Sequence, residues 1–167
     1  GAINLSKEEQ KTYDNKTKFI DKLKFSKKEY SVDDVDEFFK SIISEWNSFD
    51  SINLNSNNIL NNNLNKKINS ILKSLDLKND EKDNLSFELE IELLKNNSDE
   101  MNKKLQFIKR KISELEDESN QFQNNLEFFS DSSSDNPLFK NVSAKINTIN
   151  NKIEFWRKRV NKIEKNS

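Results

Sequence analysis

Residues 101–163 read MNKKLQFIKRKISELEDESNQFQNNLEFFSDSSSDNPLFKNVSAKINTINNKIEFWRKRVNKI. Apolar residues recur through this stretch at alternating steps of three and four, in two runs. The first run is Met101, Leu105, Ile108, Ile112, Leu115, Phe122, Leu126 and Phe129, and only Ser119 interrupts it; the second, uninterrupted, is Phe139, Val142, Ile146, Ile149, Ile153, Trp156, Val160 and Ile163. Heptads sustained over this length predict helices that bury a narrow seam against a partner helix.

The segment between the two runs predicts a loop. Residues 130–136 are all polar, and Pro137 follows them. Asn136 is a suitable N-cap and Pro137 a suitable first helical residue. We therefore expect two helices, at about 98–129 and 137–164, that fold back on each other as an antiparallel hairpin.

The loop also predicts the register of this hairpin. Placing Phe129 opposite Phe139 pairs residues whose numbers add up to 268. Seven of the eight resulting layers are apolar on both sides, and the eighth contains Ser119. The layers below the first are Leu126–Val142, Phe122–Ile146, Ser119–Ile149, Leu115–Ile153, Ile112–Trp156, Ile108–Val160 and Leu105–Ile163.

Composition extends the helical prediction to the whole chain. One Gly and one Pro in 167 residues leave few turn or bulge signals for a sheet. Charged residues make up 34% and hydrophobic residues 32%, which suits thin helical assemblies. We predict an all-α protein in which four shorter helices, within residues 1–97, form a bundle packed against the base of the long antiparallel coiled-coil hairpin of residues 98–167.

Capping signals locate the four shorter helices. Ser6 with Glu9 forms a capping-box pattern for a helix over about 7–25, and Ser31 precedes a second helix that extends to about Phe49. A third helix runs from the break at 50–55 to about residue 75. A fourth opens at Asn79 or Asp80 and ends at 96–98, although residues 86–92 alternate as in a strand. Ser98 is expected to cap the long helix that follows.

The chain lacks the side chains that several classes of functional site require. Without Cys or His there is no thiol nucleophile and neither the commonest general base nor the commonest metal ligand. The carboxylates Glu88, Glu92, Glu114 and Glu118 lack the Glu-x-x-His motif of di-iron bundles. We therefore expect no enzyme, no cofactor, no metal and no small-molecule substrate.

Targeting signals are also missing from the sequence. No apolar run approaches the roughly 20 residues of a membrane span, and no signal peptide is visible. The absence of Cys fits a reducing cytosol. The chain starts Gly-Ala-Ile-Asn without an initiator Met, which predicts a fragment or a processed protein. We expect a cytoplasmic protein with no membrane partner.

The second half of the chain resembles a known family. The segments MNKKLQFIKRKISELEDESNQFQNNLEFFSDSSSDNPLF and NKIEFWRKRVNKI are similar to the C-terminal region of the bacterial family called domain of unknown function 349. The matching residues are Phe107, Ile108, Lys111, Ile112, Glu114, Glu118, Gln121, Asn124, Asn125, Leu126, Phe128, Phe129, Asn136, Pro137, Leu138 and Trp156. The segment FFKSIISEWNSFDSI resembles the family's tryptophan-bearing repeat helix more loosely. The resemblance implies an intracellular all-helical protein built of repeated small bundles, and it implies no activity.

A second apolar strip lies off the predicted seam. It consists of Phe107 and Phe155, near the open end of the hairpin, and Phe128 also lies off the seam. One interpretation is that the second and fourth helices dock on Phe107 and Phe155. The other is that the strip is a partner site.

Charge is distributed unevenly around this strip. Residues 137–167 carry eight Lys or Arg against two acids, whereas residues 76–130 carry eight against fourteen. On the flanks of the seam, Glu118 is expected to face Lys152, Lys109 to face Arg157, and Lys111 to face Arg159. The like charges need a counter-charge, which Glu88 and Glu92 could supply. The alternatives are a phosphate-bearing partner such as RNA and a solvated band.

We therefore predict a non-catalytic helical scaffold or protein-interaction module of a bacterial cytoplasmic protein. The alternative is an RNA- or ribosome-associated factor that binds through the basic band. The candidate contact residues for a protein or RNA partner are Lys109, Lys111, Arg157, Arg159, Phe107 and Phe155. The oligomeric state stays open, since a heptad hairpin can also pair with a second copy or exchange helices.

Overall fold

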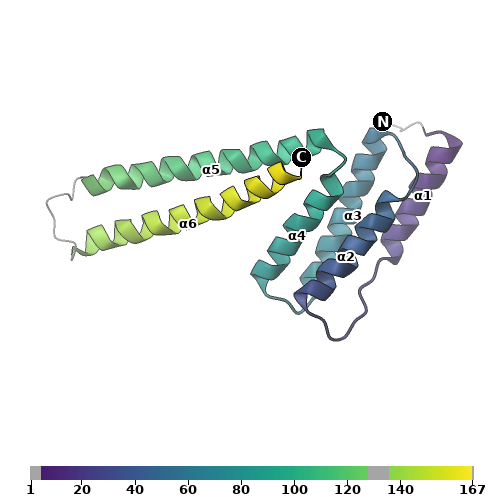
Figure 1. Ribbon diagram of the computed structural model, residues 1–167, viewed down its shortest axis with the longest axis horizontal. Helices are drawn as coiled ribbons and strands as arrows, with labels where there is room; N and C mark the ends of the chain where they lie inside the picture. Colours follow the sequence, from purple (N-terminus) through teal and green to yellow (C-terminus); the bar gives the residue numbers. More distant parts are fainter. Residues whose placement is uncertain (1–4, 128–135, 167) are drawn as a thin grey trace. The chain divides into compact units, whose positions relative to one another are not determined.

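The computed structural model describes residues 5–127 and 136–166, and these residues form six helices and no strand. Figure 1 shows the helices in chain order. The all-α prediction is confirmed. The helices are α1 (Lys7–Lys22), α2 (Val32–Asn47), α3 (Leu54–Ser74), α4 (Asn79–Leu94), α5 (Ser98–Glu127) and α6 (Pro137–Lys165).

The chain divides into two compact units, Gly1–Leu93 and Leu94–Ser167. The first contains α1 to α4 and the second contains α5 and α6. The division falls at the end of α4, a few residues before the predicted boundary at 97. The predicted packing of the bundle on the base of the hairpin stays a prediction.

Capping motifs define the starts of most helices. Ser6 and Glu9 form the predicted capping box of α1, and Ser31 forms another with Asp34 at the start of α2. At α6, Asn136 Oδ1 accepts from the Leu138 N–H, as predicted. The predicted cap of α5 is wrong by one residue. The side chain of Asn97, rather than of Ser98, accepts from the Glu100 N–H, because Ser98 is already the first residue of the helix.

The capping box of α1 also joins two helices. Glu9 accepts hydrogen bonds from the backbone N–H groups of Ser6 and of Asn53, the N-cap of α3. These two donors, Ser6 foremost, lower the pKa of the Glu9 carboxyl below its ordinary value. One carboxylate therefore fixes the start of α1 against the start of α3.

The bundle of α1 to α4 is built around one apolar core. All four helices contribute buried residues to it. Figure 1 shows these four helices, α1 to α4. In α2, the buried positions are Val35, Phe39, Ile43 and Trp46. The most deeply buried core members on the other helices are Leu60, Leu64, Ile68, Leu72 and Leu89.

Alternating apolar residues do not make a strand in α4. The residues from Leu85 to Leu93 form helix, as predicted, and every second one is buried. Leu85, Leu89 and Leu93 are four residues apart and join the bundle core. Phe87 and Ile91 form a second buried stripe that is not part of that core. The alternating apolar residues therefore belong to a helix that has two buried faces.

The second unit is a pair of long helices. Figure 1 shows α5 and α6 lying side by side with opposite directions, and the two pack against each other. Every described seam position from Met101 to Leu126 and from Phe139 to Ile163 is buried or half-buried. The predicted Phe129–Phe139 layer, Phe128 and the loop at 130–135 lie outside the described residues.

Candidate interaction surface on the helical hairpin

The heptads of α5 and α6 define two flanks on either side of the seam. The paired flank consists of Lys109, Glu116 and Gln123 on α5, and Asn150, Arg157 and Glu164 on α6. The basic flank consists of Lys104, Lys111 and Glu118 on α5, and Lys145, Lys152 and Arg159 on α6. Within each set, neighbours on one helix are seven residues apart, so they lie on the same side.

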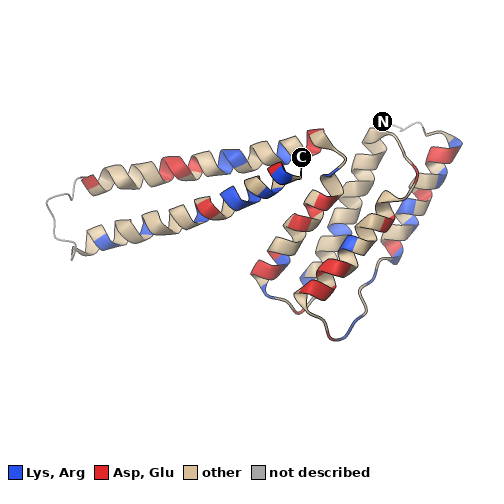
Figure 2. Cartoon of the chain, viewed as in Figure 1, with Lys and Arg blue, Asp and Glu red and all other residues tan. Residues whose placement is uncertain are grey.

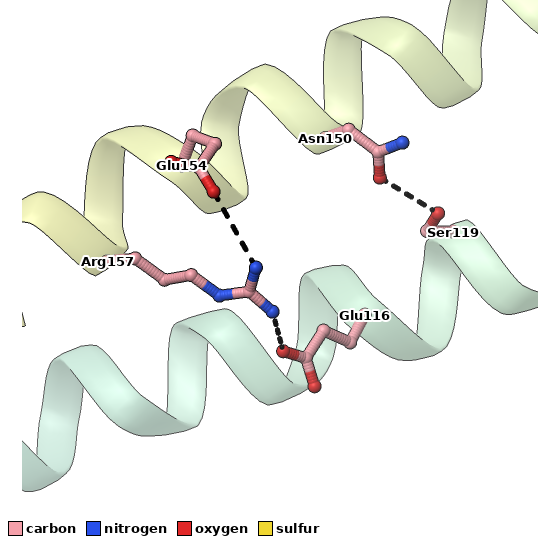
Figure 3. Close-up of polar contacts among 5 residues, drawn as sticks. All are labelled: Glu116, Ser119, Asn150, Glu154 and Arg157. Atoms are coloured by element: carbon pink, nitrogen blue, oxygen red, sulfur yellow. Dashed lines mark hydrogen bonds and ion pairs between the residues drawn. The ribbon is translucent and has the colours of Figure 1, made fainter.

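Opposite charges meet along the paired flank. Arg157 Nη2 lies 2.9 Å from Glu116 Oε1, and Lys109 Nζ lies 3.5 Å from Glu164 Oε1. Arg157 Nη1 also lies 3.7 Å from Glu154 on its own helix (Figure 3). The basic member is on α5 in one pair and on α6 in the other. The signs thus alternate along the flank.

The prediction that Lys109 faces Arg157 is wrong. Helical side chains lean toward the N-terminus of their own helix. In an antiparallel pair, this lean carries Lys109 toward the end of α6, where Glu164 lies, and it carries Arg157 in the opposite direction, toward Glu116. The hairpin supplies these counter-charges itself. The suggested supply from Glu88 and Glu92 stays a prediction.

The Ser119 layer joins the two helices through polar groups. Ser119 Oγ donates to Asn150 Oδ1 at 3.2 Å (Figure 3). Gln123 Nε2 donates to Ser119 Oγ at 3.3 Å. Asn150 is adjacent to Ile149, which the predicted register places opposite Ser119. Ser119 is 4% exposed, so these hydrogen bonds compensate the burial of its hydroxyl group.

The Glu116–Arg157 pair is expected to contribute to the stability of the hairpin. A double-mutant cycle of Glu116→Gln and Arg157→Gln should show a coupling energy of about 0.2–1 kcal/mol, since both side chains are roughly half exposed. The coupling should shrink as salt is added. A coupling that is zero at low salt, measured by urea unfolding, would contradict the pairing.

Cations lie over aromatic rings on the basic flank. Lys111 Nζ is 5.3 Å from the centre of the Trp156 ring and 5.4 Å from that of Phe107. The guanidinium of Arg159 is 4.3 Å from the Phe155 ring and 5.2 Å from Trp156. Lys111 and Arg159 therefore meet at one level, as predicted, and share one indole ring. Cation–π attraction there offsets part of their mutual repulsion.

A shallow groove continues the basic flank away from this level. Its lining consists of Glu118, Phe122, Ala144, Lys145, Thr148, Ile149 and Lys152. Lys145 Nζ lies 5.6 Å from the Phe122 ring. Glu118 and Lys152 share the groove, but neither forms an ion pair within the described part of the chain. Their predicted proximity therefore does not produce a salt bridge.

The six predicted contact residues thus divide between the two flanks. Lys109 and Arg157 lie on the paired flank and are neutralised there. Lys111 and Arg159 lie on the basic flank, and Arg159 is buried, with only 9% exposed. Phe107 and Phe155 are 54% and 40% exposed. Docking of α2 and α4 on these two rings stays a prediction.

Figure 2 shows basic residues along much of α6 and acidic residues on α4. In the hairpin, the excess of positive charge lies on one flank rather than on one helix. One flank of the hairpin is balanced, and the other carries five Lys or Arg with Glu118 as its acid. A partner attracted by positive charge would therefore meet the basic flank.

A buried lysine in the bundle has no counterpart in the sequence predictions. Lys16 on α1 is 5% exposed, and its Nζ donates to Asn57 Oδ1 at 3.3 Å and lies 4.5 Å from the Trp46 ring centre. Burial lowers the pKa of Lys16 below 10.5. The sequence signal for this burial is the helical spacing of Lys16, four residues after Thr12 and four before Ile20, both of which are buried.

The Lys16 site predicts a characteristic pH dependence. Burial disfavours the ammonium, so the folded protein releases this proton at a lower pH than the unfolded chain does. The free energy of unfolding should therefore rise as the pH increases through the folded pKa toward 10.5. Urea unfolding should show that the free energy of unfolding of wild type rises relative to that of Lys16→Met over this range. A difference between the two proteins that does not depend on pH would contradict the burial of Lys16.

Comparison of the chain with protein families, with curated proteins and with solved structures finds no match. The resemblance to domain of unknown function 349 accordingly stays a prediction. Within residues 5–127 and 136–166, no group of three or more acidic residues is arranged to hold a metal ion. None of the helices in these ranges is long and apolar enough to cross a membrane.

Proposed function

We propose that the chain is a non-catalytic helical interaction module that binds another protein through its α5–α6 hairpin. The observation that carries the proposal is the exposure of two large aromatic rings, Phe107 and Phe155, on one flank of the hairpin. Exposed apolar side chains that gather on one face are typical of protein-interaction sites. The edge-to-face contact of Phe155 with Trp156, at 5.3 Å between ring centres, holds one of these rings in place.

The charges around these rings support a protein partner over RNA. Affinity for RNA rests on cations that contact phosphates. Two of the four candidate cations, Lys109 and Arg157, are paired with carboxylates. The other two, Lys111 and Arg159, lie over aromatic rings. Their interactions are thus already made within the hairpin. We further propose a bacterial cytoplasmic setting, which rests on the family resemblance and the absence of Cys.

RNA association is the second candidate function, and the excess of positive charge on the basic flank favours it. It predicts retention of labelled RNA that falls steeply between about 50 and 200 mM salt. Charge reversal of Lys111 should then weaken retention, whereas charge reversal of Lys158 on the outer face of α6 should not.

Site-specific photo-crosslinking in the native cell tests the proposed function. A photoreactive phenylalanine at position 155 should form a protein adduct that survives nuclease treatment. The same residue at position 158, exposed on the outer face of α6, serves as the matched control and should not form it. An adduct that nuclease removes would replace the proposal with the RNA alternative. The absence of any adduct at 155 and 107 would overturn it.

A further inference from the structure

We propose that the basic flank of the hairpin binds an acidic amphipathic helix of the partner, seated in the groove between α5 and α6. This inference rests on the proposed function, because it specifies the partner segment for the same hairpin. The groove lies entirely within the α5–α6 unit. Its apolar lining residues, called its floor below, are Phe122, Ile149 and Ala144.

The floor of the groove suits the apolar stripe of a third helix. The seam there is not closed on the basic flank, since Phe122 stays half-buried after α5 and α6 have packed together. On α6, Ala144 and Thr148 are small and four residues apart, so they leave room for a neighbouring backbone. A helix with apolar residues at heptad spacing would cover this opening and bury the remaining area of Phe122.

The rim of the groove specifies an acidic partner. Lys145 and Lys152 are seven residues apart and line the same groove. Glutamates on the flanking heptad positions of a third helix repeat with the same spacing, so two ion pairs form in one register. Lys111 continues the row by one further heptad level from α5. Glu118 gives the groove one site at which a basic residue of the partner is preferred.

The apolar floor favours a helix over nucleic acid. A phosphate backbone would use the lysines but would leave the exposed parts of Phe122 and Ala144 without a matching group. Single-stranded binders stack bases on several exposed aromatic rings. In this groove the aromatic ring is Phe122, and Lys145 already lies over it at 5.6 Å.

A synthetic helix provides the test with the full chain. The probe is a fluorescein-labelled peptide of about four heptads with leucine at the seam positions and glutamate at the flanking positions. A second peptide with lysine in place of each glutamate controls for apolar attraction. We expect the acidic peptide to bind with an anisotropy change that weakens with salt, and the basic peptide to bind at least about tenfold more weakly.

Charge-reversal variants locate the binding site. Lys145→Glu with Lys152→Glu should weaken binding of the acidic peptide about tenfold or more. The matched control, Lys158→Glu with Lys165→Glu, has the same charge change and the same seven-residue spacing on the exposed outer face of α6, and it should stay within about twofold of wild type. Far-UV circular dichroism confirms that both variants fold.

The remaining outcomes each overturn the proposal. Equal loss in both double variants means attraction to overall charge rather than to the groove. Loss of self-association in Lys145→Glu with Lys152→Glu, measured by sedimentation, together with no peptide binding, assigns the groove to a second copy. Binding of labelled RNA with the same variant dependence, and no binding of peptide, assigns it to nucleic acid. A protein adduct at position 155 without peptide binding leaves the proposed function intact and removes this inference alone.

Discussion

Replacing Trp46 with alanine is expected to lower the free energy of unfolding of the bundle by about 3–5 kcal/mol. Trp46 is 1% exposed, and its ring lies 5.8 Å from that of Phe19, between ring centres. Its Nε1–H donates to Asn61 Oδ1 at 2.8 Å. The substitution removes the largest fully buried side chain among the described residues and leaves the amide oxygen of Asn61 without this donor. Urea unfolding followed by far-UV circular dichroism measures the loss.

A more conservative variant separates these contributions. Trp46→Phe keeps most of the apolar area but lacks the hydrogen bond to Asn61. It should therefore lower the free energy of unfolding clearly less than Trp46→Ala does. It also weakens the attraction of the Lys16 ammonium to the ring. If Trp46→Ala changes stability by less than about 1 kcal/mol, the tryptophan does not organise the core as described.

The second large effect concerns the hairpin. Ile153→Asp should cost about 3–5 kcal/mol, because it places an unpaired carboxylate at a seam position that is 5% exposed. The hairpin has one narrow apolar seam and little other buried area to compensate. We therefore expect α5 and α6 to lose their mutual packing in this variant.

The two tryptophans allow the hairpin to be followed separately. One lies on α2 and the other on α6. In a Trp46→Phe background, the fluorescence of Trp156 reports on the hairpin. Asn151→Asp adds the same charge at an exposed position of α6 and is the matched control, for which we expect little change. An unchanged Trp156 transition in Ile153→Asp would contradict the burial of the seam.

Local sequence signals predicted the helices well. The Ser6–Glu9 capping box, the Ser31 cap, the Asn136-Pro137 start and the heptads specify their own structure through short-range geometry, so no knowledge of the fold is needed. In α4 the alternating residues form a helix, because a lone strand would have no partner strand within the described residues.

The candidate surface was predicted only in part. The structure brings Lys111 and Arg159 together over Trp156, beside the exposed rings of Phe107 and Phe155. It does not bring Lys109 and Arg157 together. The ion pairs of Lys109 with Glu164 and of Arg157 with Glu116 are not predicted by a layer-by-layer alignment, because they depend on the direction in which long side chains lean. Lys16 was missed because lysine is normally exposed, and its burial depends on Trp46 and Asn57 from two other helices.

The register of the hairpin determines which residues meet on both of its flanks. A shift by one heptad, about 10 Å along a helix, would separate Glu116 from Arg157 and Lys109 from Glu164. It would also move Lys145 and Lys152 away from Phe122. The chain contains no Cys, so engineered pairs of cysteines can report the register without interference.

Disulfide trapping tests this register most directly. The pair Ser119→Cys with Ile149→Cys places two thiols in one predicted layer, whereas Ser119→Cys with Val142→Cys or with Trp156→Cys is displaced by one heptad in either direction. A disulfide requires Cα atoms about 4.4–6.8 Å apart. Mass spectrometry of the monomer after mild oxidation should show an internal disulfide in the first pair and little in the other two. A disulfide that forms preferentially in a displaced pair, or only between two chains, would contradict the hairpin described.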